Sequence, residues 1–164
     1  MEALQASGMR ALRGRALAVL ALFGVTTVYG VMLLIAFEPG VQHDSAAELV
    51  ARGDDAKAFL IADYLFIVLF AVAMPLALWR FGAALEGGRP PLWILIAVGL
   101  LVLCGLVDVG ENSLLYSATD SVSPDSVDDA HALALPKLAL FGGGLVLTIV
   151  AAVRALRVLR LGRA

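Results

Sequence analysis

The sequence predicts an all-α integral membrane protein, a four-helix bundle whose spans run up, down, up and down. Hydrophobic residues make up 61% of the 164 positions, whereas soluble domains typically contain about 45–50%. They gather in four windows, each close to the roughly 20 residues that cross about 30 Å of hydrocarbon. The windows are Ala16–Phe37, Ala58–Trp79, Leu92–Tyr116 and Ala132–Val153. They occupy over half of the chain, so we expect a single domain over residues 1–164.

The first window follows a polar segment, Met1–Arg15, that resembles the charged start of a secretory signal. The apolar run is longer than a signal core, and it ends in Phe37-Glu38-Pro39-Gly40 rather than in small residues that a signal peptidase cleaves. We therefore expect a retained first span. Within it, Thr26 and Thr27 are expected to bond the carbonyls of the preceding turn.

The connections between windows carry helix-ending and turn-forming residues. Pro39-Gly40 ends the first helix, and Ser45 and Glu48 have the spacing of a capping box, which predicts a short amphipathic helix to about Arg52. Within the second window, Pro75 removes one backbone hydrogen-bond donor, so a bend of that helix is expected near Ala71–Pro75. The glycines and prolines of segment 87–91 predict a tight hairpin between the second and third spans.

In the fourth window, the run Gly142-Gly143-Gly144 predicts close approach of a neighbouring helix.

Basic residues are distributed unevenly between the two sides of this arrangement. Nine of the twelve Lys and Arg residues lie on the side that holds both termini and the 80–91 turn. Because cytoplasmic loops are enriched in Lys and Arg, both termini are expected in the cytoplasm and both acidic loops outside the cell membrane. Topology and attraction to anionic lipid explain the basic face, so no nucleic-acid partner is predicted.

Three polar residues in the third window define the candidate site. Asp108, Glu111 and Asn112 are spaced i, i+3 and i+4, which places them on one face of a helix. Ionisable side chains at membrane depth are costly and usually face the interior of a bundle or a wet cavity.

Two other windows place ionisable side chains at a similar depth. From the outer ends of their windows, Asp63, Glu111 and Lys137 lie about 8 Å deep and Asp108 about 12 Å. We therefore expect one polar cluster in the outer half of the bilayer, with Lys137 paired to Asp63, Glu111 or both. Two alternatives remain open: Lys137 can snorkel to the headgroups, and Asp63 can lie in the wet interface.

The charge balance of this cluster motivates a functional hypothesis. Three carboxylates face one ammonium, so the ionised set carries −2, and burying excess charge is costly. A proton held by one carboxyl, or a bound cation, would reduce that charge. We predict that Asp63, Asp108, Glu111, Asn112 and Lys137 form the ligand site of a binding protein or small transporter for a cation, proton or amphiphilic amine.

Two other functions are compatible with the same residues. One is an intramembrane enzyme acting on a lipid or isoprenoid, with Asp108 or Glu111 as general acid–base and Asn112 orienting it. The other is a structural or accessory subunit whose helices are held by ion pairs.

No motif for a cofactor or a metal is found. The sequence has no glycine-rich phosphate loop, no nucleophile with its base, and no lipid-synthase pattern of spaced aspartates. His131, Asp63 and Glu111 are suitable metal ligands by type, but no paired histidine spacing accompanies them. We predict neither a cofactor nor a metal; the expected partners are membrane lipids and a small cationic or lipidic ligand. Cys104 is expected to be an apolar packing residue, and the oligomeric state is left open.

Asp63-Tyr64, Asp108-x-x-Glu111-Asn112 and Lys137 together resemble a group of small bacterial four-span membrane proteins that carry a D-x-x-E-N signature. The resemblance covers nearly the whole chain and implies the four-span architecture, but it brings no known activity. In architecture the chain is also similar to sterol-isomerase and sigma-2-receptor-like bundles, which use buried acids to engage amine or carbocation ligands. Their motifs do not match residue by residue, so no role is carried over.

Overall fold

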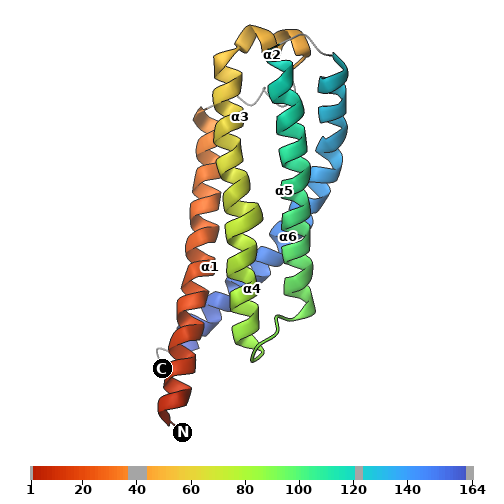
Figure 1. The fold of residues 1–164 in the computed structure, drawn as a ribbon. Coiled ribbons are helices and arrows are strands. Elements are labelled where there is room, and N and C mark those ends of the chain that lie inside the picture. Colours follow the sequence, from red (N-terminus) through yellow and green to blue (C-terminus); the bar gives the residue numbers. More distant parts are fainter. Residues whose placement is uncertain (1, 37–43, 121–123, 162–164) are drawn as a thin grey trace.

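The computed structural model describes residues 2–36, 44–120 and 124–161, which form helices and turns without a strand. Four helical rods lie side by side (Figure 1). They are α1 (Glu2–Ala36), a composite second rod, α5 (Leu92–Ala118) and α6 (Pro124–Leu161). All four are long and apolar enough to cross a membrane. The all-α class is therefore confirmed, and the chain has the features of a multi-pass membrane protein.

The helices extend beyond the apolar windows that predicted them. The second rod runs from Asp54 to Leu85 rather than from Ala58 to Trp79, and α6 begins at Pro124 rather than near Ala132. Backbone hydrogen bonding continues through polar residues, and proline is favoured in the first turn of a helix. Phe37 and Pro39-Gly40, predicted to end the first helix, lie outside the described residues.

The second rod contains a π-helical segment. It consists of α3 (Asp54–Ile67), η2 (Val68–Ala73) and α4 (Met74–Leu85). Pro75 has no N–H and so cannot bond the Ala71 carbonyl, four residues back. The N–H of the preceding residue, Met74, bonds the Leu69 carbonyl, which lies five residues back as in a π-helix. The disturbance expected near Ala71–Pro75 therefore takes the form of a widened turn. Such π segments are frequent at functional sites.

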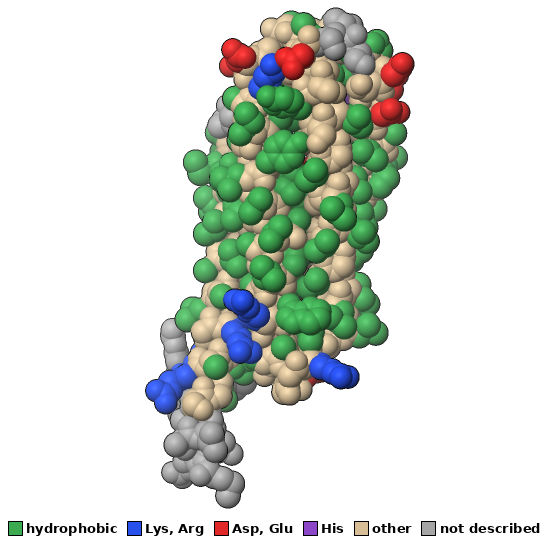
Figure 2. Space-filling model, in the orientation of Figure 1, with side chains coloured by type: hydrophobic (Ala, Val, Ile, Leu, Met, Phe, Trp, Pro, Cys, Tyr) green, Lys and Arg blue, Asp and Glu red, His purple; other side chains and the backbone are tan. Residues whose placement is uncertain are grey.

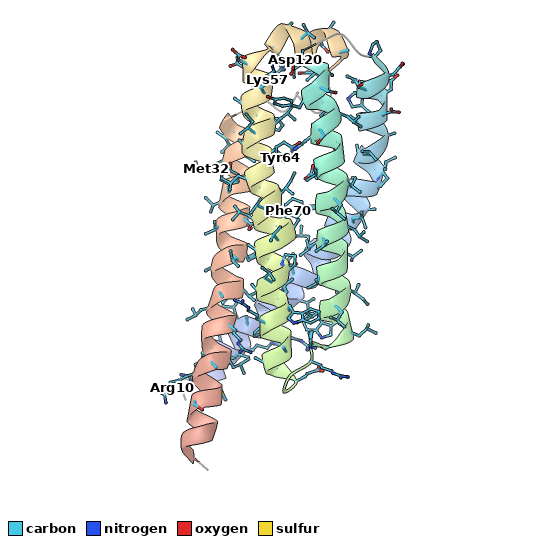
Figure 3. All side chains as sticks on the ribbon, in the orientation of Figure 1. Arg10, Met32, Lys57, Tyr64, Phe70 and Asp120 are labelled. Carbon is cyan, nitrogen blue, oxygen red and sulfur yellow. The ribbon has the colours of Figure 1, made fainter. Side chains whose placement is uncertain are left out.

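A short helix, α2 (Ala46–Arg52), covers one end of the bundle (Figure 1). Its predicted capping box is confirmed: the Ser45 N–H donates to Glu48 Oε2 at 2.8 Å, and the Glu48 N–H donates to Ser45 Oγ at 3.4 Å. The hydrogen bond from the Ser45 backbone lowers the pKa of Glu48. Gly53, at φ +48°, ends the helix. At the same end, Lys57 pairs with Asp120 (Figure 3).

The rods do not stay equally close along their length. α1 starts and α6 finishes at the same end of the bundle, and α6 runs beside α5 before crossing toward the beginning of α1 (Figure 1). Pro136 lies inside α6 and removes a backbone donor there, a common cause of such a change of direction. Near the α2 end, α1 and α6 are therefore separated.

Glycines permit the closest helix contacts. A Cβ on Gly144 would lie 2.8 Å from Leu101 Cδ2, and one on Gly143 would lie 3.1 Å from Leu100 Cδ1. The close approach predicted for this run is therefore found between α6 and α5. Gly142 faces no atom within 4 Å and is not needed for it. Of all the described glycines, Gly105 leaves the least room for a side chain, because an added Cβ would overlap Ala71 of η2.

Two apolar clusters fill the interior and leave a polar layer between them. The larger includes Ile67, Leu101 and Cys104, and the smaller lies beneath α2 and includes Leu60 and Leu115. Asp63 lies between Leu60 and Ile67 in the chain, and residues 108–112 lie between Cys104 and Leu115. Both segments therefore bring polar side chains to the gap between the clusters.

The face of the molecule drawn in Figure 2 is apolar along its middle and charged at its ends. Figure 2 shows Lys and Arg gathered at the end where α1 begins, and Asp and Glu gathered mainly at the α2 end. A hydrophobic band between charged ends is what helices crossing a bilayer require.

We predict that Gly105→Ala destabilises the protein by roughly 1–3 kcal/mol, the usual cost of overpacking. The new methyl group would overlap the Ala71 side chain. Thermal unfolding in detergent measures the effect, and adding Ala71→Gly should recover most of it. Gly99→Ala is the matched control on α5, because no atom lies within 4 Å of its Cβ position. Equal losses in the two alanine variants would contradict the packing argument.

Candidate functional site

The candidate site begins on one buried face of α5. Asp108 is 5% exposed, Glu111 1% and Asn112 0%. Their i, i+3, i+4 spacing turns all three toward the other rods, as the sequence predicted. Their burial follows from the helix contacts, since α5 packs against α6 on one side and against α3, η2 and α4 on another.

Lys137 of α6 bridges two of these side chains. Its Nζ lies 2.6 Å from Glu111 Oε2 and 3.1 Å from Asp108 Oδ1. The Lys137 side chain is 18% exposed. Because the ammonium is directed at the carboxylates, the alternative in which Lys137 snorkels to the headgroups is wrong.

Asp63 joins the cluster through a different partner than expected. Its Oδ2 accepts a hydrogen bond from Asn112 Nδ2 at 2.8 Å, and it forms no ion pair with a described Lys, Arg or His. The prediction that Lys137 pairs with Asp63, Glu111 or both is therefore confirmed for Glu111 and wrong for Asp63. The reason is that α6 packs along α5, whereas α3 carries Asp63 and approaches α5 at Asn112. Asp63 is 6% exposed, so the alternative of a wet interfacial carboxylate is also wrong.

Tyrosines fasten the second rod to its neighbours near Asp63. The hydroxyls of Tyr64 and Ser113 lie 3.0 Å apart, joining α3 to α5. On the other side, the Tyr29 hydroxyl of α1 donates to the Ala62 carbonyl at 3.0 Å. These bonds fix the height of α1, α3 and α5 relative to one another and thereby position Asp63.

The side-chain oxygen of Asn112 has no donor among the described residues. Asn112 Oδ1 is buried, and no described residue bonds it. A buried acceptor without a hydrogen bond costs about 1–3 kcal/mol. The Asn112 amide therefore holds Asp63 through Nδ2, while its own Oδ1 has no described hydrogen-bond donor.

A cavity of about 640 Å³ adjoins the cluster. Asp63, Asp108, Glu111 and Lys137 line one part of it. Its remaining lining is mainly apolar and aromatic, and comes from every rod: Phe23, Thr26, Thr27, Gly30, Val31, Leu33, Phe59, Phe66, Phe70, Met74, Leu101, Cys104, Ala134, Leu138, Phe141, Leu145 and Thr148. Ligand sites commonly enclose about 300–1,000 Å³ and combine apolar walls with a few placed polar groups.

The cavity is elongated along the helices. Its lining on α5 extends from Leu101 to Glu111, and this separation of ten residues corresponds to roughly 15 Å at the rise of an α-helix. Phe70 joins the aromatic side chains of the wall, with its ring centroid 5.0 Å from that of Phe66 and 5.8 Å from that of Phe141. A polar group at the cluster can therefore have an apolar body beside it.

Sequence reasoning did not identify most of this wall. Phe66, Phe70 and Phe141 are ordinary apolar residues in apolar runs, and the cavity between them depends on how the rods diverge. Thr27 donates to the Phe23 carbonyl as expected, but Thr26 Oγ1 has no described partner and lines the cavity, which corrects the expectation for Thr26. Cys104 is buried as expected, with its Sγ 3.6 Å from the Lys137 carbonyl.

No grouping of three or more His, Cys, Asp or Glu side chains suitable for a metal ion occurs within segments 2–36, 44–120 and 124–161. Asp63, Asp108 and Glu111 are instead oriented by Asn112 and Lys137. The chemistry that this arrangement offers is therefore that of carboxylates facing an apolar space.

Comparison of the chain with protein-family models, with curated proteins and with solved structures finds no match. The geometry of the site is therefore the basis for inferring what the protein does.

We predict that Lys137→Met lowers the free energy of unfolding by about 3–5 kcal/mol, because it leaves two buried carboxylates without their ammonium. Adding Glu111→Gln or Asp108→Asn should recover part of that loss, because one orphaned charge disappears. Adding Asp63→Asn should give an additive effect, since Asp63 is bonded by Asn112. Double-mutant cycles of thermal stability in detergent measure these couplings. A coupling of Lys137 to Asp63 as strong as to Glu111 would contradict the geometry.

Proposed function

We propose that this protein binds an amphiphilic amine, with the ammonium of the ligand at Asp63 and its apolar body in the aromatic cavity. The observation that carries the proposal is that Asp63 lines the cavity and has only the neutral Asn112 amide as a described side-chain partner. The ligand site comprises Asp63, Asp108, Glu111, Asn112 and Lys137, and Asp63 is its primary anion.

Electrostatic balance supports a cationic ligand. Lys137 compensates one of the two carboxylates that it contacts, and the ionised cluster of three carboxylates and one ammonium carries −2. A buried anion without a counter-charge is strongly disfavoured. A ligand ammonium at Asp63 would reduce the net charge to −1 and gain a charge-assisted hydrogen bond.

The cavity favours an organic cation over the other ligands that the cluster suits by charge. A proton or a small inorganic cation needs only the carboxylates, whereas the adjoining 640 Å³ is walled mainly by apolar side chains. A purely structural role for the cluster would be served by a closed, dry arrangement of paired groups. For an enzyme, Asp108 and Glu111 would first have to leave the ammonium that lies within 3.1 Å of both.

The protein is proposed to reside in the cell membrane with its basic end in the cytoplasm. The sidedness of charge along the bundle supports this orientation (Figure 2). In the proposed orientation, the cluster would lie in the outer half of the bilayer. We also propose that the protein is a member of the group of small four-span membrane proteins with the D-x-x-E-N signature.

Reporter fusions test the orientation. Reporters after Arg89 and after Ala164 should show cytoplasmic activity, and reporters near Gly53 and Ser123 should show activity outside, because basic flanks are retained in the cytoplasm. An outside signal at the carboxyl end would contradict the proposed orientation and, with it, the placement of the site in the outer leaflet.

Binding measurements test the ligand class. In detergent, the purified protein should bind dodecylamine more tightly than dodecanol. A hydrogen bond to a charged group contributes about 1.5–3 kcal/mol, which corresponds to roughly tenfold or more in Kd. Asp63→Asn should remove that preference while leaving the affinity for dodecanol unchanged.

Asp120→Asn serves as the control, because Asp120 is an exposed carboxylate at the α2 end that pairs with Lys57 (Figure 3). Isothermal titration calorimetry reports both affinities. Equal binding of the amine and the alcohol by the unaltered protein would refute the proposed ligand class.

A further inference from the structure

The cavity wall is not equally covered on all sides. Among the residues that line it, three are exposed on the outer surface of the molecule: Thr27 and Val31 of α1, and Leu138 of α6. Val31 is 48% exposed and Leu138 67%. The cavity is therefore open between α1 and α6, where these helices diverge toward the α2 end (Figure 1).

The opposite wall of the cavity is closed. The lining residues of η2, α4 and α5 are all buried: Phe70, Met74, Leu101, Cys104, Asp108 and Glu111. Toward the basic end, α1 and α6 both contribute to the larger apolar cluster, through Ala16 and Val19 of α1 and Ala151 and Ala155 of α6. These faces offer no comparable opening.

The α2 end of the bundle is also closed. Beneath α2, the smaller apolar cluster contains Leu49, Leu60 and Leu115, each 0% exposed. Leu60 precedes Asp63 by one turn of α3, and Leu115 follows Asn112 by one turn of α5. A hydrated ion approaching along the bundle axis would have to cross this apolar layer before reaching Asp63.

The opening lies at the level of the polar cluster and faces an apolar surface. Leu138 follows Lys137 in α6, and Val31 lies two residues from Tyr29, whose hydroxyl bonds the Ala62 carbonyl beside Asp63. Exposed apolar side chains flank it, including Val28 of α1 at 60% and Leu135 of α6 at 78%. Such side chains are suited to contact with lipid tails.

We propose that the opening bordered by Thr27, Val31 and Leu138 is a lateral portal through which a membrane-dissolved amphiphile reaches the cluster directly from the bilayer. This rests on the proposed function, because it takes the cavity as the ligand site, and it makes the ligand a lipid-phase molecule rather than an aqueous solute. The ligand keeps its ammonium near headgroup depth until it passes between α1 and α6.

Tryptophan substitutions at the portal test this inference. Reconstituted protein is mixed with dodecylamine carrying a diazirine on its chain, the vesicles are flash-photolysed at successive times, and cavity peptides around Cys104 are examined by mass spectrometry. Thr27→Trp and Leu138→Trp, singly and combined, should slow labelling of the cavity. We expect at least about a tenfold decrease in the rate for the combined variant, within the range over which association rates vary among mutants.

Matched controls are available on the same helices. Leu17→Trp on α1 and Val153→Trp on α6 alter exposed apolar residues that do not line the cavity and lie nearer the basic end, away from the opening, so they should leave the labelling rate unchanged. Thermal unfolding verifies that each variant is folded; if Thr27→Trp is not, Leu138→Trp and Val153→Trp alone decide the result.

The outcomes separate the portal from the ligand class. Equal labelling rates in portal and control variants would overturn the portal and leave the amine site intact. A diazirine dodecanol that reaches the same final extent of cavity labelling as the amine at equal concentration, and is slowed equally by the portal variants, would overturn the preference for an amine while supporting the portal. Absence of cavity labelling by either compound in the unaltered protein would overturn both.

Discussion

The high cost of charge in an apolar interior constrains the whole arrangement. Asp108 and Glu111 are buried on α5 because Lys137 of α6 lies within 3.1 Å of both. This bridge requires α6 to stay close to α5 at that height. Further along the same contact, Gly143 and Gly144 have no side chain and so permit a close approach of the two helices. Asp63 then depends on Asn112 of the same α5 face. The four rods thus meet around a layer of charge, with apolar clusters on either side.

The same layer explains where the cavity lies. A continuous apolar core would allow α1 and α6 to pack against each other along their full length. Near the basic end, buried alanines of both helices belong to one apolar cluster. Around the cluster, Lys137 joins α6 to α5 by ion pairs, and Tyr29 joins α1 to α3 by a hydrogen bond. At that height the space between α1 and α6 is lined by carboxylates on its inner side.

How far the sequence predicted this structure depended on the range of the interactions involved. Hydropathy gave the four spans, and the i, i+3, i+4 spacing gave the inward face of Asp108, Glu111 and Asn112, because both are local properties of a helix. Depth along each span identified Asp63 and Lys137 as members of the cluster. It could not choose the partner of Lys137, because depth does not specify which face of α6 meets which face of α5. The cavity and the role of Thr26 depend on how the rods diverge, for which a single sequence carries no signal.

Pairing across the α5–α6 contact also bears on how the chain is built into the membrane. α5 is synthesised before α6, so Asp108 and Glu111 reach the bilayer before Lys137 exists to neutralise them. An ionised acid opposes insertion by about 2.5–3.5 kcal/mol at the centre of a span, and by less toward its ends, where Asp108 and Glu111 are placed. The strongly apolar remainder of α5 must offset this until α6 arrives. The last two helices are therefore expected to integrate as one cooperative hairpin, with the ammonium of α6 completing the insertion of its predecessor.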